Sequence, residues 1–474
     1  MKYKIRKSCL LVLLAILTLS GCNVGPKYER PETAADEKGF VNAEEKQAEL
    51  EYEAVSWWVS FGDETTNALV EKALENNKDL QSAALTVLQS EALLKSSSGR
   101  RLPGVDYNGK VTRSRSVTDN VITGDRQGIY STNYDLGISV SYVADIFGKL
   151  KRGEKAAIAE LWSSQATKEA LEHAIIAQVI KARIQISQLH GLLAIAQDTT
   201  KSWKKSLDTI EKRYERGLLQ PEDLHLAREN YAANQSNIPE LQQQLALAYN
   251  SLDVLLGQKP GSTEQFGGLE RALPNLEKVP VGMPATLLDR RPDLRAAEFR
   301  VMAANEKVGA SIAALYPDLT FTASGGLRDD KLSDLLDWEN RVYSLIAGIT
   351  GPLFKGGALK ADVKLKKAQM EQASVQYAGT VLKALREVED ALVKENKLQE
   401  TLSFSETRID EANKAEQLAT DRYLNGANGS FLKVLEIQRR RQAAQNQLVQ
   451  IRSNIWSNRV DLYLALGGSW NTDK

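Results

Sequence analysis

The chain has 474 residues, with 61 Lys or Arg against 61 Asp or Glu and only three His. This balance of charge argues against a nucleic-acid partner, because general nucleic-acid binders are basic. Apolar residues make up 42% of the chain, which excludes an intrinsically disordered protein. Three His in so long a chain also make a metal centre or an acid–base site built on His a poor hypothesis.

The N-terminus predicts export followed by a lipid anchor. Residues 2–7 hold four basic residues, and an apolar run over 9–19 follows, which is typical of a signal peptide and too short to span a bilayer. Residues 19–22, LSGC, resemble a lipobox in which the Cys22 thiol takes the lipid; an ordinary signal peptide with a chance Cys is the alternative. Cleavage before Cys22 leaves 61 − 4 = 57 basic residues against 61 acidic ones, a net charge of −4. Asn23, rather than Asp, favours the outer membrane.

The rest of the chain reads as a tandem repeat of about 210 residues. Residues 79–103 align without a gap to 293–317, an offset of 214, and share six identities. The motif Arg-Tyr-x-x-Gly at 213–217 returns at 422–426, an offset of 209, and Leu-Gly at 256–257 returns at 466–467.

Each repeat is expected to contain a short helix, two strands, a long helix and a second short helix. Apolar residues spaced by three and four predict long helices over roughly 153–216 and 358–424, each about 100 Å long. The short helices are expected over roughly 64–100 and 222–256, the second with a kink at Pro239. No later run of about 18 apolar residues predicts a membrane-spanning helix.

The strands alternate apolar residues with small or polar ones. Tyr134 to Tyr142 and Tyr343 to Ile349 show the pattern, with Ile346 as the exception, and their partners are expected near Val105 and Leu319. Long polar loops are expected over 116–130 and 328–340. Membrane strands fit this pattern, with a soluble sheet packed on a helix as the alternative. Four strands cannot close a membrane barrel, and open edges cannot lie in lipid, so three chains sharing twelve strands is the simplest hypothesis, with two chains as its rival.

Several motifs resemble the outer membrane factor (TolC) family, in its OprM-like branch of efflux lipoproteins. They are the start of the mature chain at 22–31, WWVSFGD at 57–63, DRRPD at 289–293, YP at 316–317 and GPLF at 351–354. The resemblance covers essentially the whole chain. It implies a mainly α fold with a membrane β portion: a homotrimeric channel-tunnel with a twelve-stranded barrel above a periplasmic α-helical barrel.

The resemblance also implies partners and a division of the chain. The partners are a periplasmic adaptor, an inner-membrane RND-type pump and outer-membrane lipid, with no cofactor besides the lipid on Cys22. The expected segments are a signal peptide (1–21), an anchored segment (22–63), two repeats (64–257 and 291–467), an equatorial linker (258–290) and a tail (468–474). The equatorial belt would draw on residues near 40–60, on the linker and on the tail.

The helical turns near 216–221 and 425–430 are the expected docking end. Gly217 and Gly426 suit a left-handed residue just after a helix, and Pro221 suits the first turn of the next one. In the family these tips meet the adaptor, which here implies Arg213, Tyr214, Gly217, Leu218, Arg422, Tyr423 and Gly426; simple helical hairpins are the alternative. Candidates for an acidic, ion-paired gate are Asp410, Asp421, Arg422 and Asn428, with Asn428 where relatives often have Asp; a merely solvated face is the alternative.

The function that these patterns predict is the outer-membrane duct of a tripartite efflux pump, delivering drugs or other small molecules. A duct for type I protein secretion and a periplasmic spacer without a pore are the alternatives. An enzyme is not expected, because the phosphate-binding, nucleophile-elbow and zinc motifs are missing and His173, His190 and His225 are dispersed.

Overall fold

The computed structural model describes residues 24–32, 56–119, 126–263, 268–274, 276, 290–425 and 430–468. Cys22, Gly426 and Asn428 therefore lie outside the described residues, as does much of the expected equatorial belt. The chain divides into two compact units. The strand unit comprises 1–31, 86–165 and 296–377, and the helical unit comprises 32–85, 166–295 and 378–474. Each unit draws on both sequence repeats.

The helices confirm the tandem repeat through their lengths. The helices α3 (Lys78–Gly99) and α7 (Pro292–Ala313) both have 22 residues, and α4 (Lys149–Glu215) and α8 (Ala358–Leu424) both have 67. The helices α5 (Pro221–Leu255) and α9 (Phe431–Ala465) both have 35. At 1.5 Å per residue, 67 residues give about 100 Å, as the sequence predicts. Helix α5 continues through Pro239, and the predicted kink there stays a prediction.

The predicted single helix over 64–100 is wrong, because Asn77 divides it into α2 (Glu64–Asn76) and α3. Asn77 has extended dihedrals, φ −61° and ψ 130°. Its side-chain oxygen accepts from the backbone N–H groups of Asp79 (2.9 Å) and Leu80 (3.1 Å), while its amide donates to the Leu255 carbonyl at 2.9 Å. An Asn side chain that bonds nearby backbone in this way competes with a continuous helix and caps a new one.

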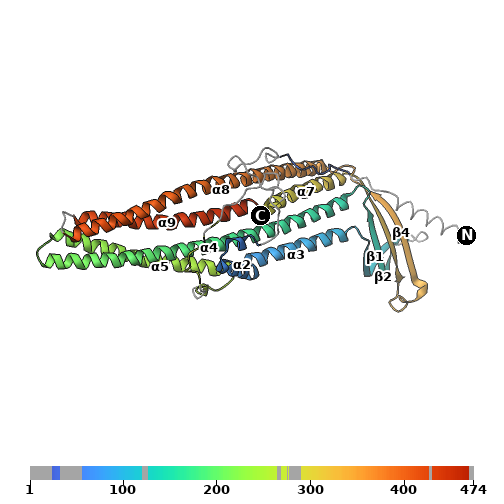
Figure 1. The fold of residues 1–474 in the computed structure, drawn as a ribbon. Helices are drawn as coiled ribbons and strands as arrows, with labels where there is room; N and C mark the ends of the chain where they lie inside the picture. Colours follow the sequence, from blue (N-terminus) through green and yellow to red (C-terminus); the bar gives the residue numbers. More distant parts are fainter. Residues whose placement is uncertain are drawn as a thin grey trace. The chain divides into compact units, whose positions relative to one another are not determined.

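The four strands form one antiparallel sheet in the order β1-β2-β3-β4. They are β1 (Gly104–Asp119), β2 (Arg126–Ala144), β3 (Asp318–Asp329) and β4 (Arg341–Thr350), and Figure 1 shows them beside one another. The pairings Val105↔Val140 and Leu319↔Ile349 confirm the predicted partners. The predicted loop over 116–130 is too long, because the ladder continues to Asp119↔Arg126. The second loop matches its prediction and includes the short helix η4 (Trp338–Asn340).

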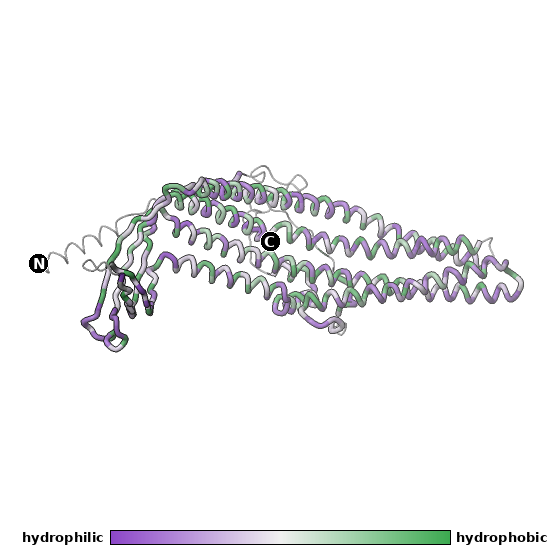
Figure 2. Tube along the Cα trace, turned by 180° about the vertical axis from the view of Figure 1, so that it is seen from behind, coloured by the Kyte–Doolittle hydropathy of each residue, from purple (hydrophilic) through white to green (hydrophobic). Residues whose placement is uncertain are grey.

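The core of the helical unit follows the predicted α4 seam. Buried side chains recur along α4 with heptad spacing from Ile175 to Ile210, and the α5 residues Leu224 and Ala227 meet its end. Hydrophobic and hydrophilic residues alternate along the helices and strands instead of forming long apolar runs (Figure 2). Among the described helices, none combines the length and the apolar character needed to cross a membrane.

Candidate functional site

The sheet has one apolar face, and that face is exposed. Because the strands pair in register, Tyr107, Ile138, Leu345 and Tyr343 fall on the same side, and these tyrosines are 88% and 89% exposed. The opposite side carries Asp106, Ser139, Ser324 and Ser344 in one cross-strand row. The predicted exception holds, since Ile346 lies on the polar side. A sheet built this way has one surface suited to lipid and one suited to water.

The polar face also carries a row of charges across three strands. Lys110 pairs with Asp135, which pairs with Arg328 in the next strand. The Arg328 guanidinium donates to the Asp135 carboxylate. A row of opposite charges of this kind, with one ion pair across β2 and β3, is suited to a face in contact with water.

The first described residues tie the start of the chain to the strand unit. The Val24 N–H donates to the Phe147 carbonyl at 3.5 Å, just beyond the end of β2, and Arg152 donates to the Pro26 carbonyl at 3.0 Å. Further along, Arg30 makes two hydrogen bonds to Glu298, of 3.0 and 2.6 Å. The Tyr28 hydroxyl donates a hydrogen bond to the same Glu298 carboxylate. The pKa of this hydroxyl is raised, mainly because it is partly buried and secondly because the negative charge of Glu298 is close. Residues 24–30 are therefore held by hydrogen bonds to the end of β2, the start of α4 and α7.

The predicted turn after α4 is confirmed. Gly217 has φ +74°, the Leu218 N–H donates to the Arg213 carbonyl at 3.0 Å, and the Gly217 N–H donates to the Tyr214 carbonyl at 2.8 Å. This pair of bonds is a Schellman motif with Gly217 at C′. Pro221 begins α5 as predicted. The turn leaves Leu218 67% exposed and Tyr214 39% exposed.

The two Arg-Tyr-x-x-Gly motifs meet at this end of the helical unit. The Arg213 guanidinium lies 4.9 Å from the centre of the Tyr423 ring and donates to the Tyr423 and Leu424 carbonyls at 3.4 and 3.2 Å. Tyr423 is buried in a cluster shared by four helices, which contains Trp203, Leu207, Ile210, Leu224, Ala227, Phe431, Val434 and Leu435. Burial raises the pKa of the Tyr423 hydroxyl. The sequence paired these motifs as repeats but did not predict their contact.

The gate candidates are not gathered within one described chain. Asp410 pairs with Lys414 at 2.6 Å on the surface of α8. The hydrogen bonds that Lys414 donates to the carboxylates of Asp410 and Glu411 raise the pKa of Lys414 to about 12. Asp421 and Arg422 are exposed at the end of α8. Asp410 and Asp421 are 421 − 410 = 11 residues apart, about 16 Å along a helix, so they cannot share a site within one copy.

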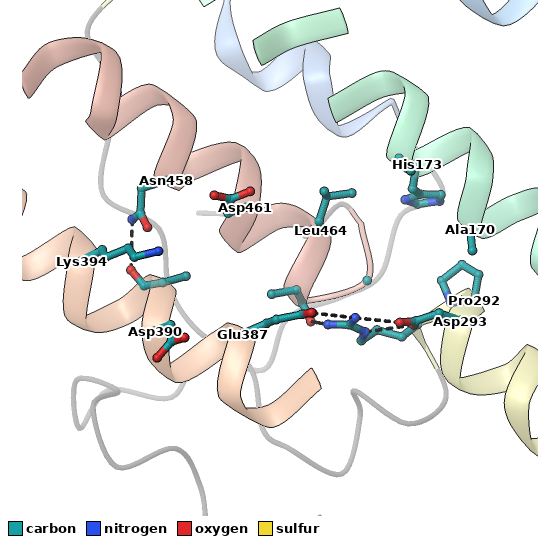
Figure 3. A pocket seen from close by; sticks show the side chains of 15 residues that line it. Ala170, His173, Pro292, Asp293, Glu387, Asp390, Lys394, Asn458, Asp461 and Leu464 are labelled. Atoms are coloured by element: carbon teal, nitrogen blue, oxygen red, sulfur yellow. Dashed lines mark hydrogen bonds and ion pairs between the residues drawn. The ribbon is translucent and has the colours of Figure 1, made fainter. Parts of the chain in front are cut away.

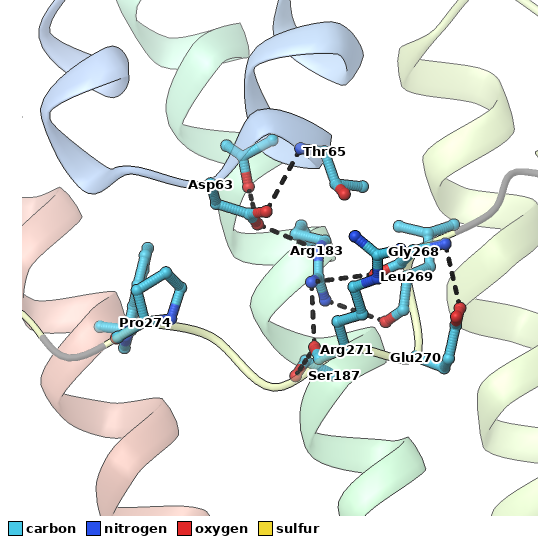
Figure 4. Close-up of polar contacts among 11 residues, drawn as sticks. Asp63, Thr65, Arg183, Ser187, Gly268, Leu269, Glu270, Arg271 and Pro274 are labelled. Atoms are coloured by element: carbon cyan, nitrogen blue, oxygen red, sulfur yellow. Dashed lines mark hydrogen bonds and ion pairs between the residues drawn. The ribbon is translucent and has the colours of Figure 1, made fainter.

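A buried cation that the sequence did not single out joins three segments of the helical unit (Figure 4). Arg183, which is inaccessible to solvent, donates to the carbonyls of Leu269 (2.9 Å) and Arg271 (3.0 Å). Its Nε lies 3.3 Å from the Asp63 carboxylate, which also caps α2 by accepting from the Thr65 N–H. Burial lowers the pKa of Arg183, while Asp63 opposes that effect. The described linker residues 268–271, part of the expected equatorial belt, are thus bonded to α4.

The DRRPD motif has a structural role at a polar pocket of about 400 Å³, which Arg291, Pro292 and Asp293 help to line (Figure 3). Arg291 donates to Asp293 at 2.7 and 3.0 Å, to Glu387 at 2.8 Å and to the Ala465 carbonyl at 3.1 Å. It therefore connects the start of α7 with α8 and the end of α9. The WWVSFGD motif is similarly structural, because Trp57 stacks on Tyr463 with ring centres 5.2 Å apart.

Comparisons with known proteins agree with this architecture. The family model described as outer membrane efflux protein matches residues 69–258 and 283–468. The chain is 31% identical to the toluene efflux pump outer membrane protein TtgF of Pseudomonas putida, with 98% of both chains covered. It is 28% identical to the cation efflux system protein CusC of Escherichia coli, with 97% of this chain and 98% of the relative covered. The solved outer-membrane channel OprN matches with a TM-score of 0.86 and 29% identity, over 95% of this chain and 100% of that chain.

These matches span both repeats and both units, so they concern the whole architecture rather than one part of it. They favour efflux over the type I secretion duct, the spacer and the enzyme. The chain belongs to the outer membrane efflux protein family and is an outer-membrane efflux channel that extends into the periplasm.

Proposed function

We propose that three copies of this chain form one lipid-anchored channel that receives cargo from an inner-membrane RND-type pump through a periplasmic adaptor. Each copy contributes four strands to a twelve-stranded barrel and its long helices to a periplasmic tunnel. The two repeats, 64–257 and 291–467, supply equivalent hairpins and helices, and the segments 22–63, 258–290 and 468–474 contribute to the belt around the tunnel.

The observation that carries this proposal is the sheet with an exposed apolar face. Its outer strands β1 and β4 each pair with a single strand in the described chain, so both sheet edges have unpaired backbone groups. Each unpaired N–H or C=O group in a lipid core costs on the order of several kcal/mol of free energy, as for any buried amide without a hydrogen-bond partner. Joining β4 of one copy to β1 of the next removes every edge, and three copies give 3 × 4 = 12 strands.

Native mass spectrometry of the purified mature protein in detergent tests this assembly. The expected mass is three chains, and a dimeric or monomeric mass would contradict the proposal. Because the chain has only Cys9 and Cys22, engineered thiols on β1 and β4 can be oxidised without competing cysteines in the sheet. Non-reducing gels of the oxidised protein should show cross-linked dimers and trimers and no larger species. In planar bilayers, the purified protein should conduct ions.

The adaptor is proposed to contact the helical tips through Arg213, Tyr214, Gly217, Leu218, Arg422, Tyr423 and Gly426. The exposed Leu218 supports this assignment, because it is apolar and has no core to enter. Leu218→Glu should weaken co-purification with the adaptor about tenfold, the effect of losing about 1.4 kcal/mol. Leu247→Glu is the matched control, since Leu247 is 58% exposed elsewhere on α5. Equal binding by both variants would count against tip docking.

The gate is proposed to form where copies meet, from Asp410, Asp421, Arg422 and Asn428. Three-fold symmetry would bring three copies of each carboxylate around the pore, where like charges repel unless basic neighbours are close. Arg422→Gln should then raise channel conductance, whereas Arg386→Gln, on an exposed part of α8 away from the tip, should leave it unchanged. Unchanged conductance in Arg422→Gln would remove this residue from the gate.

The lipid is proposed to be attached to Cys22, and no other cofactor is proposed. Val24 lies two residues further on and is tied to Phe147 at the end of the strands, so a lipid on Cys22 would start near the membrane boundary. Cys22→Ser should abolish incorporation of labelled palmitate. A labelled Cys22→Ser protein would show that the lipid is attached elsewhere.

The pump, rather than this channel, is proposed to select the cargo, which comprises drugs or other small molecules. The names of the similar proteins refer to cargo as different as toluene and cations, although they match this chain over nearly its whole length. Exchanging the partner pump while keeping this channel should change the resistance profile. A profile that follows the channel instead would contradict the proposal.

A further inference from the structure

Arginines follow the apolar residues on the same face of both outer strands, and on β1 only Val117 comes after them on that face among the apolar residues. On β1 this face carries Val105, Tyr107 and Val111, and the next residues on the same side are Arg113 and Arg115. On β4 it carries Ile349, Leu345 and Tyr343, and the next residue on that side is Arg341. From Val105 to Arg113 the strand covers about 26 Å, close to the height of the apolar band in membrane barrels.

The guanidinium groups of Arg113, Arg115 and Arg341 each lie over an aromatic ring. The guanidinium carbons of Arg113 and Arg115 lie 5.9 and 5.7 Å from the centre of the Tyr130 ring. On β4, Arg341 lies 5.5 Å from the centre of the Trp338 ring and donates to the Trp338 carbonyl at 3.0 Å. These distances are in the range of cation–π contacts, which hold a guanidinium against the sheet surface instead of letting it extend freely.

The cross-strand neighbour of Val117 leaves room for this arrangement. Gly128 has no side chain, and a Cβ there would lie only 2.7 Å from Nε of Arg115. A larger residue would therefore push the guanidinium off the strand surface. The absence of a side chain at Gly128 therefore allows Arg115 to lie along the strand surface.

The seated arginines keep donors available. Within the described part of the chain, no ion pair joins Arg113, Arg115 or Arg341 to a carboxylate, in contrast to Arg328, which pairs with Asp135 on the polar face. A planar guanidinium with free N–H groups binds phosphate in a bidentate manner, and it is less strongly hydrated than an ammonium group. Its place at the end of an apolar band is where a lipid carries its head group.

We infer that Arg113, Arg115 and Arg341 form a collar that binds the phosphate groups of phosphorylated lipid, such as lipid A, in the outer leaflet. Tyr130 and Trp338 act as platforms that orient the guanidinium groups, and the apolar face below them accepts the acyl chains. This inference rests on the proposed function only in that the apolar face must meet lipid. It requires no particular cargo, adaptor or gate.

The test measures lipid A retained by the full-length protein in detergent, using bisphosphorylated lipid A, monophosphorylated lipid A and phosphatidylcholine as probes. The wild type should retain the bisphosphorylated lipid most strongly and phosphatidylcholine least. Each Arg→Gln substitution in the collar should weaken retention about fivefold, the contribution of one basic residue near a charged membrane surface. Arg→Lys substitutions should lie between the wild type and the Gln variants.

Lys110→Gln is the matched control, because it removes one positive charge from the opposite face of the same strand. An equal loss in Lys110→Gln, or no loss in the triple variant Arg113→Gln, Arg115→Gln and Arg341→Gln, would overturn the inference. Release of lipid A by an equal concentration of inorganic phosphate would show a simple anion site and overturn the lipid assignment. Conductance measured in parallel separates the two proposals: a wild type that retains lipid A but does not conduct contradicts the channel, not the collar.

Discussion

The sheet and the helical unit use apolar residues in opposite ways. In the sheet, Tyr107, Tyr343 and Leu345 are 80% exposed or more, whereas Ile180 and Trp203 in the helical unit are at most 1% exposed. Charged groups differ in the same way, since Arg183 is buried among helices, whereas Arg328 of the strand ion pair with Asp135 is 60% exposed. The strands therefore present large apolar side chains to their surroundings, as a surface in contact with lipid does, whereas the helical unit buries such side chains in a core of its own.

The largest expected effect concerns the buried cation of the helical unit. Arg183→Met removes the cation that pairs with the Asp63 carboxylate and the hydrogen bonds to the carbonyls of Gly268, Leu269 and Arg271. Removing one partner of a buried pair typically costs about 3–5 kcal/mol of unfolding free energy. Thermal or urea unfolding followed by circular dichroism measures the loss, with the exposed Arg386→Met as control. A stability unchanged within error would show that this network does not hold the belt to α4.

The second prediction sharpens the difference between the two faces of the sheet. Leu345→Arg places a charge in the middle of the apolar face, where insertion into a bilayer should cost about 2–4 kcal/mol. Ser344→Arg places the same charge on the neighbouring residue, which faces the polar side. The yield of folded protein in outer-membrane fractions should fall for the first variant only. Equal yields would break the assignment of the faces.

The third prediction tests a turn that belongs to neither apolar surface. Gly217 has φ +74°, and an added Cβ there would meet no atom within 4 Å, so only backbone strain opposes substitution. Gly217→Val should lower the unfolding free energy by about 1–2 kcal/mol, whereas Gly217→Asn should cost less, because Asn tolerates the left-handed region. Both variants can be compared by thermal melting. A Val variant as stable as the Asn variant would contradict the Schellman geometry.

The smallest effect concerns pH and the aromatic core beside η2 (Trp57–Phe61). Burial raises the pKa of the Tyr463 hydroxyl, which shares a 2.8 Å hydrogen bond with Ser60. In the unfolded chain the Tyr463 hydroxyl loses its proton at about pH 10, whereas in the folded chain it stays neutral to a higher pH. The unfolding free energy therefore falls as the pH rises above about 10. Tyr463→Phe should lose about 0.5–1.5 kcal/mol at neutral pH and show a shallower alkaline decline. An equally steep decline would assign it to other tyrosines.

The sequence determined the features that depend on local periodicity. The offsets of 214 and 209 residues predicted the equal lengths of the paired helices, and the alternation around Tyr134 and Tyr343 predicted which face of each strand is apolar. Gly217 and Pro221 predicted the turn between α4 and α5, because each residue type has a conformational preference that does not depend on distant contacts.

Which polar groups meet depends on the folded chain and could not be predicted from local spacing. Asn77 interrupts a helix by bonding to its own neighbours and to Leu255, and Arg213 stacks on Tyr423 from the other repeat. Arg183 takes its carbonyl partners from a segment more than 80 residues away. A pattern of spacing describes one element at a time, whereas a buried guanidinium is stabilised by donors and acceptors that folding brings together. The fold was therefore largely readable from the sequence, and the polar contacts that fasten it were not.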